Sequence, residues 1–269
     1  EYKKAAELAP TMIAPRLRLA EAYIALKEFG KAVEECSSVI RRSPRADAYY
    51  LRGLAYLNEG TLDAAERDLK TAVKADESYA EAYVALGDLL LQKAEIKRAE
   101  LSYAKALEID PNLSSAHRRM GDLYAMSGKI EEAISCYKNA VEADPGFALN
   151  YNNLAWLLAS TERDLEEAQK LAEKAISIDP RSPILLDTLG YIYYAKGMYH
   201  KAITTLTAAK ACDQGNPTIA YHLGMTYWKI GEDKRAAKEL REALNLDPSF
   251  EGADEARRIL NEMKRRRKR

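Results

Sequence analysis

The stretch that decides the fold is residues 114–147, SSAHRRMGDLYAMSGKIEEAISCYKNAVEADPGF. Its second half places apolar residues at the spacing of an amphipathic helix, at Ile130, Ala133, Ile134, Tyr137, Ala140 and Val141. The first half carries a similar stripe of His117, Met120, Gly121 and Tyr124. Ser127 and Gly128 interrupt the pattern between the halves, where a turn between two antiparallel helices belongs. The stretch therefore predicts a helical hairpin.

Small residues predict a close contact between the two helices. Gly121 and Ala133 lie on the facing stripes, where the absence of a large side chain lets the helices approach each other. We expect larger neighbours to interlock around them, namely Met120, Tyr124, Ile134 and Tyr137. Pro145 should end the second helix, since proline lacks an N–H and disfavours the α conformation of the preceding residue.

This unit recurs along nearly the whole chain. The small residue of the first helix returns at intervals of 33, 34, 34, 34, 35 and 34 residues, at Ala20, Gly53, Gly87, Gly121, Ala155, Gly190 and Gly224. Two further series keep the same spacing, one at Ala32, Ala65, Ala99, Ala133, Ala168, Ala202 and Ala236, and the other seven residues after each of these. Such hairpins bury their apolar stripes only against their neighbours, so no single central core is expected.

A hairpin of 34 residues with these small residues, a tyrosine and a closing proline resembles the tetratricopeptide repeat. The tyrosine positions hold Tyr23, Tyr56, Tyr124, Tyr193 and Tyr227, and the proline positions hold Pro44, Pro111, Pro145, Pro180 and Pro248. The resemblance covers residues 1–250. Glu77 and Gln214 replace two prolines, and the stretch ASTERDLEEA has one extra residue between the helices of the fifth copy. We expect these changes to alter loops and junctions only.

We therefore predict an all-α protein, an α-solenoid of seven hairpins, which the resemblance implies is a right-handed superhelix. Residues 1–12 are interpreted as the second helix of a truncated preceding repeat. The seven repeats are expected at 13–45, 46–79, 80–113, 114–147, 148–182, 183–216 and 217–250. Residues 251–269 are interpreted as a capping helix with a basic tail. Because the chain opens with EYKKAAELAP, we interpret it as part of a longer protein.

Composition limits the kinds of partner. The chain has 269 residues, of which 47% are hydrophobic and 30% charged, and it contains no run long enough for a membrane span. It carries 41 basic and 41 acidic residues, but six of the basic ones are Lys264 to Arg269. The preceding residues, 1–263, therefore have an excess of six acidic residues, which argues against a nucleic-acid groove and against a helical-repeat RNA binder. The sequence is compatible with either the periplasm or the cytoplasm.

The sequence offers no catalytic or metal-binding constellation. Its histidines, His117, His200 and His222, are dispersed, and motifs for a phosphate loop, a serine nucleophile or a zinc protease are absent. Cys36, Cys136 and Cys212 occupy three different places in the unit, which we interpret as buried thiols rather than disulfides or metal ligands. We predict a protein that is not an enzyme and has no cofactor.

The family resemblance implies a concave inner face lined by the first helix of each hairpin. In the first three repeats its exposed positions hold a mixed set, Arg18, Glu21, Tyr50, Leu54, Glu81, Val84 and Asp88. From the fourth repeat onward the predicted partner-binding residues are Arg118, Arg119, Asn152, Asn153, Trp156, Asp187, Tyr191, Tyr194, Tyr221, His222, Trp228 and Lys229, with Thr188 and Met225 on the same face. Tyrosine and tryptophan are frequent binding anchors. In the alternative interpretation, Tyr194 and Trp228 only wedge between adjacent first helices.

Two narrower functions of the family are not supported by these positions. A clamp for a chaperone's terminal carboxylate would need lysine, asparagine and arginine over three consecutive hairpins, and beside Arg119, Asn152 and Asn153 its lysines are lacking. An asparagine ladder, as in a glycosyltransferase superhelix, would need asparagine where Arg18, Leu51, Ala85, Arg119, Asn153, Thr188 and His222 stand.

We therefore predict a scaffold that binds a partner protein or peptide in the concave groove. Trp156, Tyr191, Tyr221 and Trp228 are the expected anchors. The alternative is a component of a bacterial polysaccharide synthesis or export assembly that recruits an enzyme or contacts glycan. It rests on a resemblance of residues 186–240 to repeat proteins associated with exopolysaccharide production and export.

Overall fold

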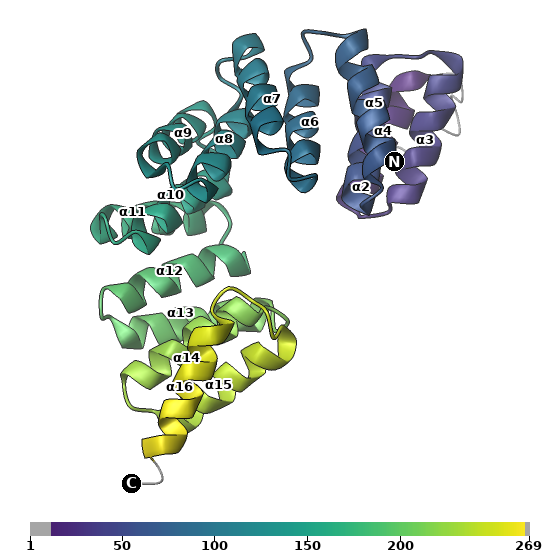
Figure 1. Cartoon of the computed structure of the whole chain (residues 1–269). Coiled ribbons are helices and arrows are strands. Elements are labelled where there is room, and N and C mark those ends of the chain that lie inside the picture. Colours follow the sequence, from purple (N-terminus) through teal and green to yellow (C-terminus); the bar gives the residue numbers. More distant parts are fainter. Residues whose placement is uncertain (1–11, 267–269) are drawn as a thin grey trace. The chain divides into compact units, whose positions relative to one another are not determined.

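The computed structural model describes residues 12–266, and this part of the chain contains fifteen helices and no strand (Figure 1). The predicted all-α solenoid of helical hairpins is confirmed. The helices are α2 (Ile13–Ala25), α3 (Phe29–Arg42), α4 (Ala46–Glu59), α5 (Leu62–Ala75), α6 (Ala80–Gln92), α7 (Ile96–Ile109), α8 (Ser114–Met126), α9 (Ile130–Ala143), α10 (Ala148–Ser160), α11 (Leu165–Ile178), α12 (Pro183–Ala195), α13 (Tyr199–Cys212), α14 (Pro217–Lys229), α15 (Asp233–Leu246) and α16 (Ala253–Arg266).

The helices belong to two compact units. Unit 1 is Glu1–Ala143, with α2 to α9 in its described part, and unit 2 is Asp144–Arg269, with α10 to α16. Within both units, each even-numbered helix up to α14 pairs with the helix that follows it. The helix expected over residues 1–12 lies outside the described residues, except for Met12, which precedes α2.

First helices of successive hairpins contact one another directly. In unit 1 these contacts join α2 to α4, α4 to α6 and α6 to α8, and in unit 2 they join α10 to α12 and α12 to α14. Neighbouring second helices contact each other less. The first helices of each unit therefore form a continuous surface, which we call the inner face of that unit.

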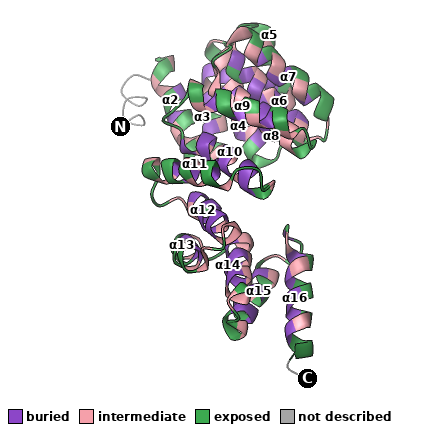
Figure 2. Ribbon diagram, turned by 90° about the vertical axis from the view of Figure 1, so that its left-hand side faces the viewer, coloured by how far each residue is buried: buried purple, intermediate pink, exposed green. Residues whose placement is uncertain are grey.

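In five of the seven hairpins described, the two helices meet at a glycine, whereas the buried Ala20 and Ala155 stand at this place in the other two. A Cβ atom added to Gly87 or Gly121 would lie 2.4 or 2.6 Å from the ring of Tyr103 or Tyr137, on the second helix of the same hairpin. At Gly53, Gly190 and Gly224 a leucine of the second helix takes the same place, and its nearest side-chain atom would lie 2.5 to 2.8 Å from the added Cβ. Buried residues follow these contact surfaces between the helices (Figure 2). The predicted close approach at the small residues is therefore confirmed.

The last helix of unit 2 packs through one apolar side. Ala256, Ile259, Leu260 and Met263 of α16 join a buried cluster with Leu240 of α15. Lys264, Arg265 and Arg266 at the end of the helix are exposed. This separation of apolar and basic residues is that of an amphipathic helix lying on a neighbouring hairpin.

The cysteines differ in their environments. Cys36 is fully buried, and burial raises the pKa of its thiol to about 12. Cys136 is half-buried, whereas Cys212, the last residue of α13, is exposed. The prediction of buried thiols is therefore wrong for Cys212, because the helix ends there and nothing in the described part of the chain covers the residue.

Gly87→Ala should destabilise the protein. The new methyl group would displace the buried ring of Tyr103, and such overpacking costs about 1–3 kcal/mol. Urea unfolding followed by circular dichroism would measure this loss. Gly30→Ala is the matched control, because no atom lies within 4 Å of its added Cβ and alanine favours a helix by up to about 1 kcal/mol over glycine. Equal stability of the two variants would contradict the packing role of Gly87.

Candidate functional site

The structure divides the twelve predicted partner-binding residues between the two units. Arg118 and Arg119 lie on α8 of unit 1. The other ten lie on the first helices of unit 2: Asn152, Asn153 and Trp156 on α10, Asp187, Tyr191 and Tyr194 on α12, and Tyr221, His222, Trp228 and Lys229 on α14. Each group is therefore described within its own unit.

A row of aromatic rings crosses the inner face of unit 2. The ring centroids of Trp156 and Tyr191 are 4.9 Å apart, and those of Tyr191 and His222 are 5.0 Å apart. Tyr221 continues the row at 5.6 Å from His222. We call these four residues the aromatic row. Because each ring contacts the next, the side chains hold one another in place.

His222, a member of this row, belongs to a buried polar pair with Asp187. His222 and Asp187 are only 6% and 8% exposed, and the Nδ1 atom of His222 lies 2.9 Å from Oδ1 of Asp187. Trp156 and Tyr191 contact the imidazole and shield it from solvent. The expectation that inner-face positions are exposed is therefore wrong for this pair, and Asn152 and Thr188 are buried as well.

The tyrosine hydroxyls on this face remain protonated well above neutral pH. Burial raises the pKa of Tyr221 to about 12, and the carboxylate of Glu255 adds to the increase. Burial likewise raises the pKa of Tyr194 to about 12, with contributions from neighbouring tyrosines. At neutral pH both side chains are phenols, able to donate and to accept hydrogen bonds.

Trp228 and Lys229 lie at the end of α14. Trp228 packs against the buried cluster that α16 shares, and its indole Nε1 is buried without a hydrogen-bond partner among the described residues. The Nζ atom of Lys229, an exposed residue, lies 5.8 Å from the tryptophan ring. Trp228 therefore contributes to the packing of α14 against α15 and α16.

Carboxylates hold the arginines of unit 1 in place. Arg119 pairs with Asp88 at 3.0 Å and with Asp122 at 3.6 Å, and Arg118 lies 3.7 Å from Asp122. The hydroxyl of Tyr103, from a second helix, donates to Asp88 at 2.7 Å. Tyr137 donates in the same way to Asp122 at 2.8 Å. Burial raises the pKa of Asp88, an effect that the positive charge of Arg119 opposes.

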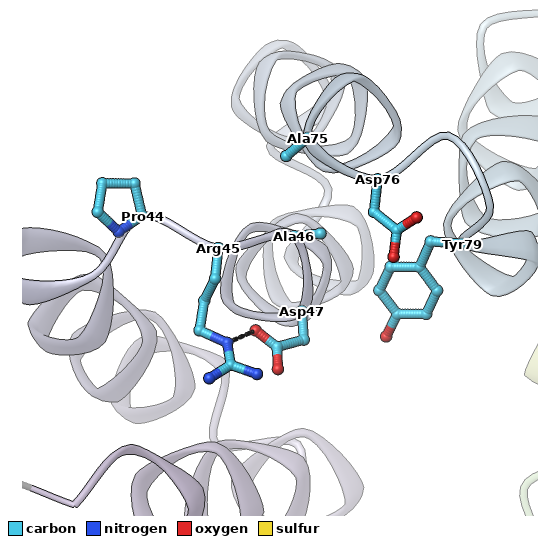
Figure 3. A pocket seen from close by; sticks show the side chains of 7 residues that line it. All are labelled: Pro44, Arg45, Ala46, Asp47, Ala75, Asp76 and Tyr79. Carbon is cyan, nitrogen blue, oxygen red and sulfur yellow. Dashed lines mark hydrogen bonds and ion pairs between the residues drawn. The ribbon is translucent and has the colours of Figure 1, made fainter.

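Sequence reasoning missed the hollows of unit 1, three of which lie beside the tyrosines of its inner face. One of about 540 Å³ lies between the ends of two hairpins and is lined by the residues drawn in Figure 3: Pro44, Arg45, Ala46, Asp47, Ala75, Asp76 and Tyr79. A second of about 200 Å³ shares Arg45, Asp47 and Tyr79 with it. A third of about 160 Å³ lies against Tyr50, Glu81 and Asp88. Several lining residues belong to the mixed set of inner positions, whose sequence pattern gives no sign of a hollow.

Two kinds of site are not found in residues 12–266. No group of three or more histidine, cysteine, aspartate or glutamate side chains is arranged to hold a metal ion there. Within the same residues, none of the helices combines the length and apolarity needed to cross a bilayer.

Sequence models of the tetratricopeptide repeat match most of the chain. The matches cover residues 17–69 and 50–114, then 114–147, and finally 148–182 and 217–250. The chain belongs to the tetratricopeptide repeat family. Its hairpins, glycine contacts and inner faces are therefore those of a known repeat class.

Solved tetratricopeptide structures share this fold at low sequence identity. A chain of the APC/C hetero-tetramer Cut9–Hcn1 is 17% identical with a TM-score of 0.82, covering 97% of this chain and 51% of its own length. PilF of Pseudomonas aeruginosa is 22% identical with a TM-score of 0.67, and the match covers 78% of this chain and 95% of PilF. YrrB, described as a repeat protein with an unusual peptide-binding site, is 23% identical with a TM-score of 0.53, and the match covers 71% of this chain and 97% of YrrB. The present chain thus spans about half the length of the Cut9–Hcn1 chain that it matches.

Asp187→Ala should destabilise unit 2. The substitution leaves Nδ1 of the buried His222 without its partner, and an unsatisfied buried polar group costs about 1–3 kcal/mol. Urea unfolding followed by tryptophan fluorescence would detect the change, because Trp156 contacts His222. Asp254→Ala is the control, since its fully exposed carboxylate pairs only with an exposed arginine, and the midpoint should stay unchanged. A wild-type midpoint for Asp187→Ala would show that the pair does not stabilise the fold.

Proposed function

We propose that this protein is a non-enzymatic scaffold that binds a segment of a partner protein along the inner face of unit 2. The observation that carries the proposal is the aromatic row, Trp156, Tyr191, His222 and Tyr221, whose rings contact one another across three first helices. Trp156, Tyr191 and Tyr221 are half-buried, so each keeps part of its surface available. Aromatic side chains of this kind dominate the binding energy of many interfaces.

The geometry of the row favours binding over packing alone. Mutual contacts restrict the rotamers of Trp156 and Tyr191, so less side-chain entropy is lost when a partner binds. The phenol of Tyr221 stays protonated at neutral pH and can hydrogen-bond to a peptide backbone. Asn153, half-buried on α10, supplies an amide on the same helix as Trp156. The face thus combines apolar area with polar groups that orient a ligand.

Two of the similar structures support a role in protein binding. YrrB is described by its peptide-binding site, and the Cut9–Hcn1 chain belongs to a hetero-tetramer. Both share the helical repeat fold with this chain. Trp228 and Lys229 remain part of the proposed face, with Trp228 at its edge against the cluster shared with α16.

A second candidate function is contact with glycan in a polysaccharide synthesis or export assembly. Aromatic rings and amides on one face, here Trp156, Tyr191 and Asn153, are groups that stack on sugar rings and hydrogen-bond to hydroxyls. Glycan-array binding by the purified chain would support this function, and an array without signal would count against it.

Replacing Trp156 and Tyr191 together by alanine should abolish capture of the partner. Truncation of one anchor can cost more than about 1 kcal/mol of binding free energy, so the loss of two anchors should raise the dissociation constant roughly tenfold or more. Affinity capture from the source cells followed by mass spectrometry would compare the double variant with the wild type. Proteins held by the wild type and lost from the variant are the expected partners.

The matched control retains the rings. Trp156→Phe with Tyr191→Phe removes the indole and the hydroxyl but keeps two aromatic side chains in contact, so it should preserve most of the capture. Circular dichroism and thermal unfolding would establish that both double variants are folded. Undiminished capture by the folded alanine variant would overturn the proposal.

A further inference from the structure

A second aromatic pair lies on the inner face of unit 1. The rings of Tyr50 and Tyr79 are 4.9 Å apart at an interplanar angle of 55°. Tyr79 lines the two hollows that share Arg45 and Asp47, whereas Tyr50 lines the hollow on the other side, toward α8. The pair therefore forms the wall between hollows, and a ligand in either one would contact a phenol ring.

Carboxylates dominate the electrostatic environment of this pair. Burial raises the pKa of Tyr50 to about 12, and the nearby charges of Glu81, Asp88 and Glu21 raise it in the same direction. Burial also raises the pKa of Tyr79, with further increases from Tyr50 and from Glu81, Asp47 and Glu21. These acidic residues come from three different first helices, α2, α4 and α6, so their charges converge on the tyrosine pair.

Arginines that line these hollows form ion pairs with carboxylates of the same face. Arg18 pairs with Glu21 at 2.8 Å, and Arg45 pairs with Asp47 at 2.5 Å, as Figure 3 shows for the latter. Arg119 pairs with Asp88 at 3.0 Å. Glu81, in contrast, is exposed and forms no ion pair with any residue between 12 and 266. A negative charge is therefore left beside the two phenols.

The hollow of about 200 Å³ lined by Tyr79 also has an apolar wall. Leu17 and Leu51 are both less than 10% exposed and line it together with the half-buried Ile13. A side chain with a long aliphatic stem and a charged head suits such a surface, because the stem covers apolar atoms while the head remains near the carboxylates. Arginine and lysine have this structure, and their cations are attracted to the faces of tyrosine rings.

We propose that the hollow lined by Leu17, Leu51 and Tyr79 binds an arginine or lysine side chain of a partner protein segment. The aliphatic stem lies on the leucines, and the cation lies beside the tyrosine pair. Its counter-charges are Glu21, which lines this hollow and exchanges its exposed pair with Arg18 for the ligand, and Glu81, which lines the neighbouring hollow beside Tyr50. This site differs in chemistry and in position from the aromatic row of unit 2, and it does not depend on that row being the main binding face.

A peptide library identifies the preferred ligand even while the partner protein is unidentified. Random nonapeptides displayed on phage would be selected against the whole chain, and we expect enrichment of arginine and lysine beside apolar residues. A fluorescein-labelled synthetic copy of the most enriched peptide would then be titrated by fluorescence polarisation. The dissociation constant should rise with added salt, since exposed charges are screened.

Charge-neutral variants locate the site. Glu21→Gln with Glu81→Gln should weaken binding of the labelled peptide roughly fivefold or more, as two partly exposed ion pairs are lost. Glu77→Gln with Glu132→Gln is the matched control, because it removes the same charge from exposed residues of unit 1 that line none of the hollows beside the tyrosine pair. This control should bind as the wild type does.

The variants also separate this proposal from the function proposed for unit 2. Trp156→Ala with Tyr191→Ala should leave peptide binding unchanged, although it abolishes capture of the unit 2 partner. Selection of acidic peptides, or of no basic ones, would overturn the inference. Equal affinities of the wild type and the Glu21 and Glu81 double variant would also overturn it, whatever the outcome for unit 2.

Discussion

The contact of a glycine, or in two hairpins an alanine, on one helix with the side chains of the next is the constraint on which the hairpins depend. At Gly87 and Gly121 a single added carbon would lie less than 3 Å from a tyrosine ring. Protein interiors are close-packed, so a methyl group cannot be absorbed there without moving the helices apart. Since the inner face consists of first helices whose spacing follows from these hairpins, the same contact positions the binding surfaces.

The residue that covers the glycine also determines what reaches the inner face. Leu69, Leu206 and Leu240 fill the space with carbon alone. Tyr103 and Tyr137 instead pass beside the glycine and donate their hydroxyls to Asp88 and Asp122 on the first helices. These aspartates in turn pair with Arg119. The charges of unit 1 are therefore anchored to its core, which keeps Arg119 oriented toward carboxylates of its own chain.

The sequence predicted the hairpins because their pattern is local and repeated. The glycine series and the tyrosine and proline positions follow from the periodicity of helices and turns. Burial at the inner face was less predictable, because it depends on contacts between residues about 35 positions apart. Asp187 and His222 occupy positions that count as exposed on a single helix, yet they pair across α12 and α14 beneath two rings. The hollows of unit 1 arise in the same way from residues of three hairpins, which no single repeat reveals.

The two inner faces offer different physical means of binding. In unit 2 the rings of Trp156, Tyr191, His222 and Tyr221 fill the space between first helices, so a ligand would rest on a rigid aromatic surface. In unit 1 the pair of Tyr50 and Tyr79 leaves hollows on both sides, so a ligand side chain can enter. A rigid aromatic surface gains affinity from contact area, whereas a hollow with fixed charges gains specificity from the cost of placing the wrong charge in it. Because both surfaces consist of helices that contacts at small residues hold at fixed spacing, their recognition properties can diverge by substitution of inner-face side chains while the hairpins stay unchanged.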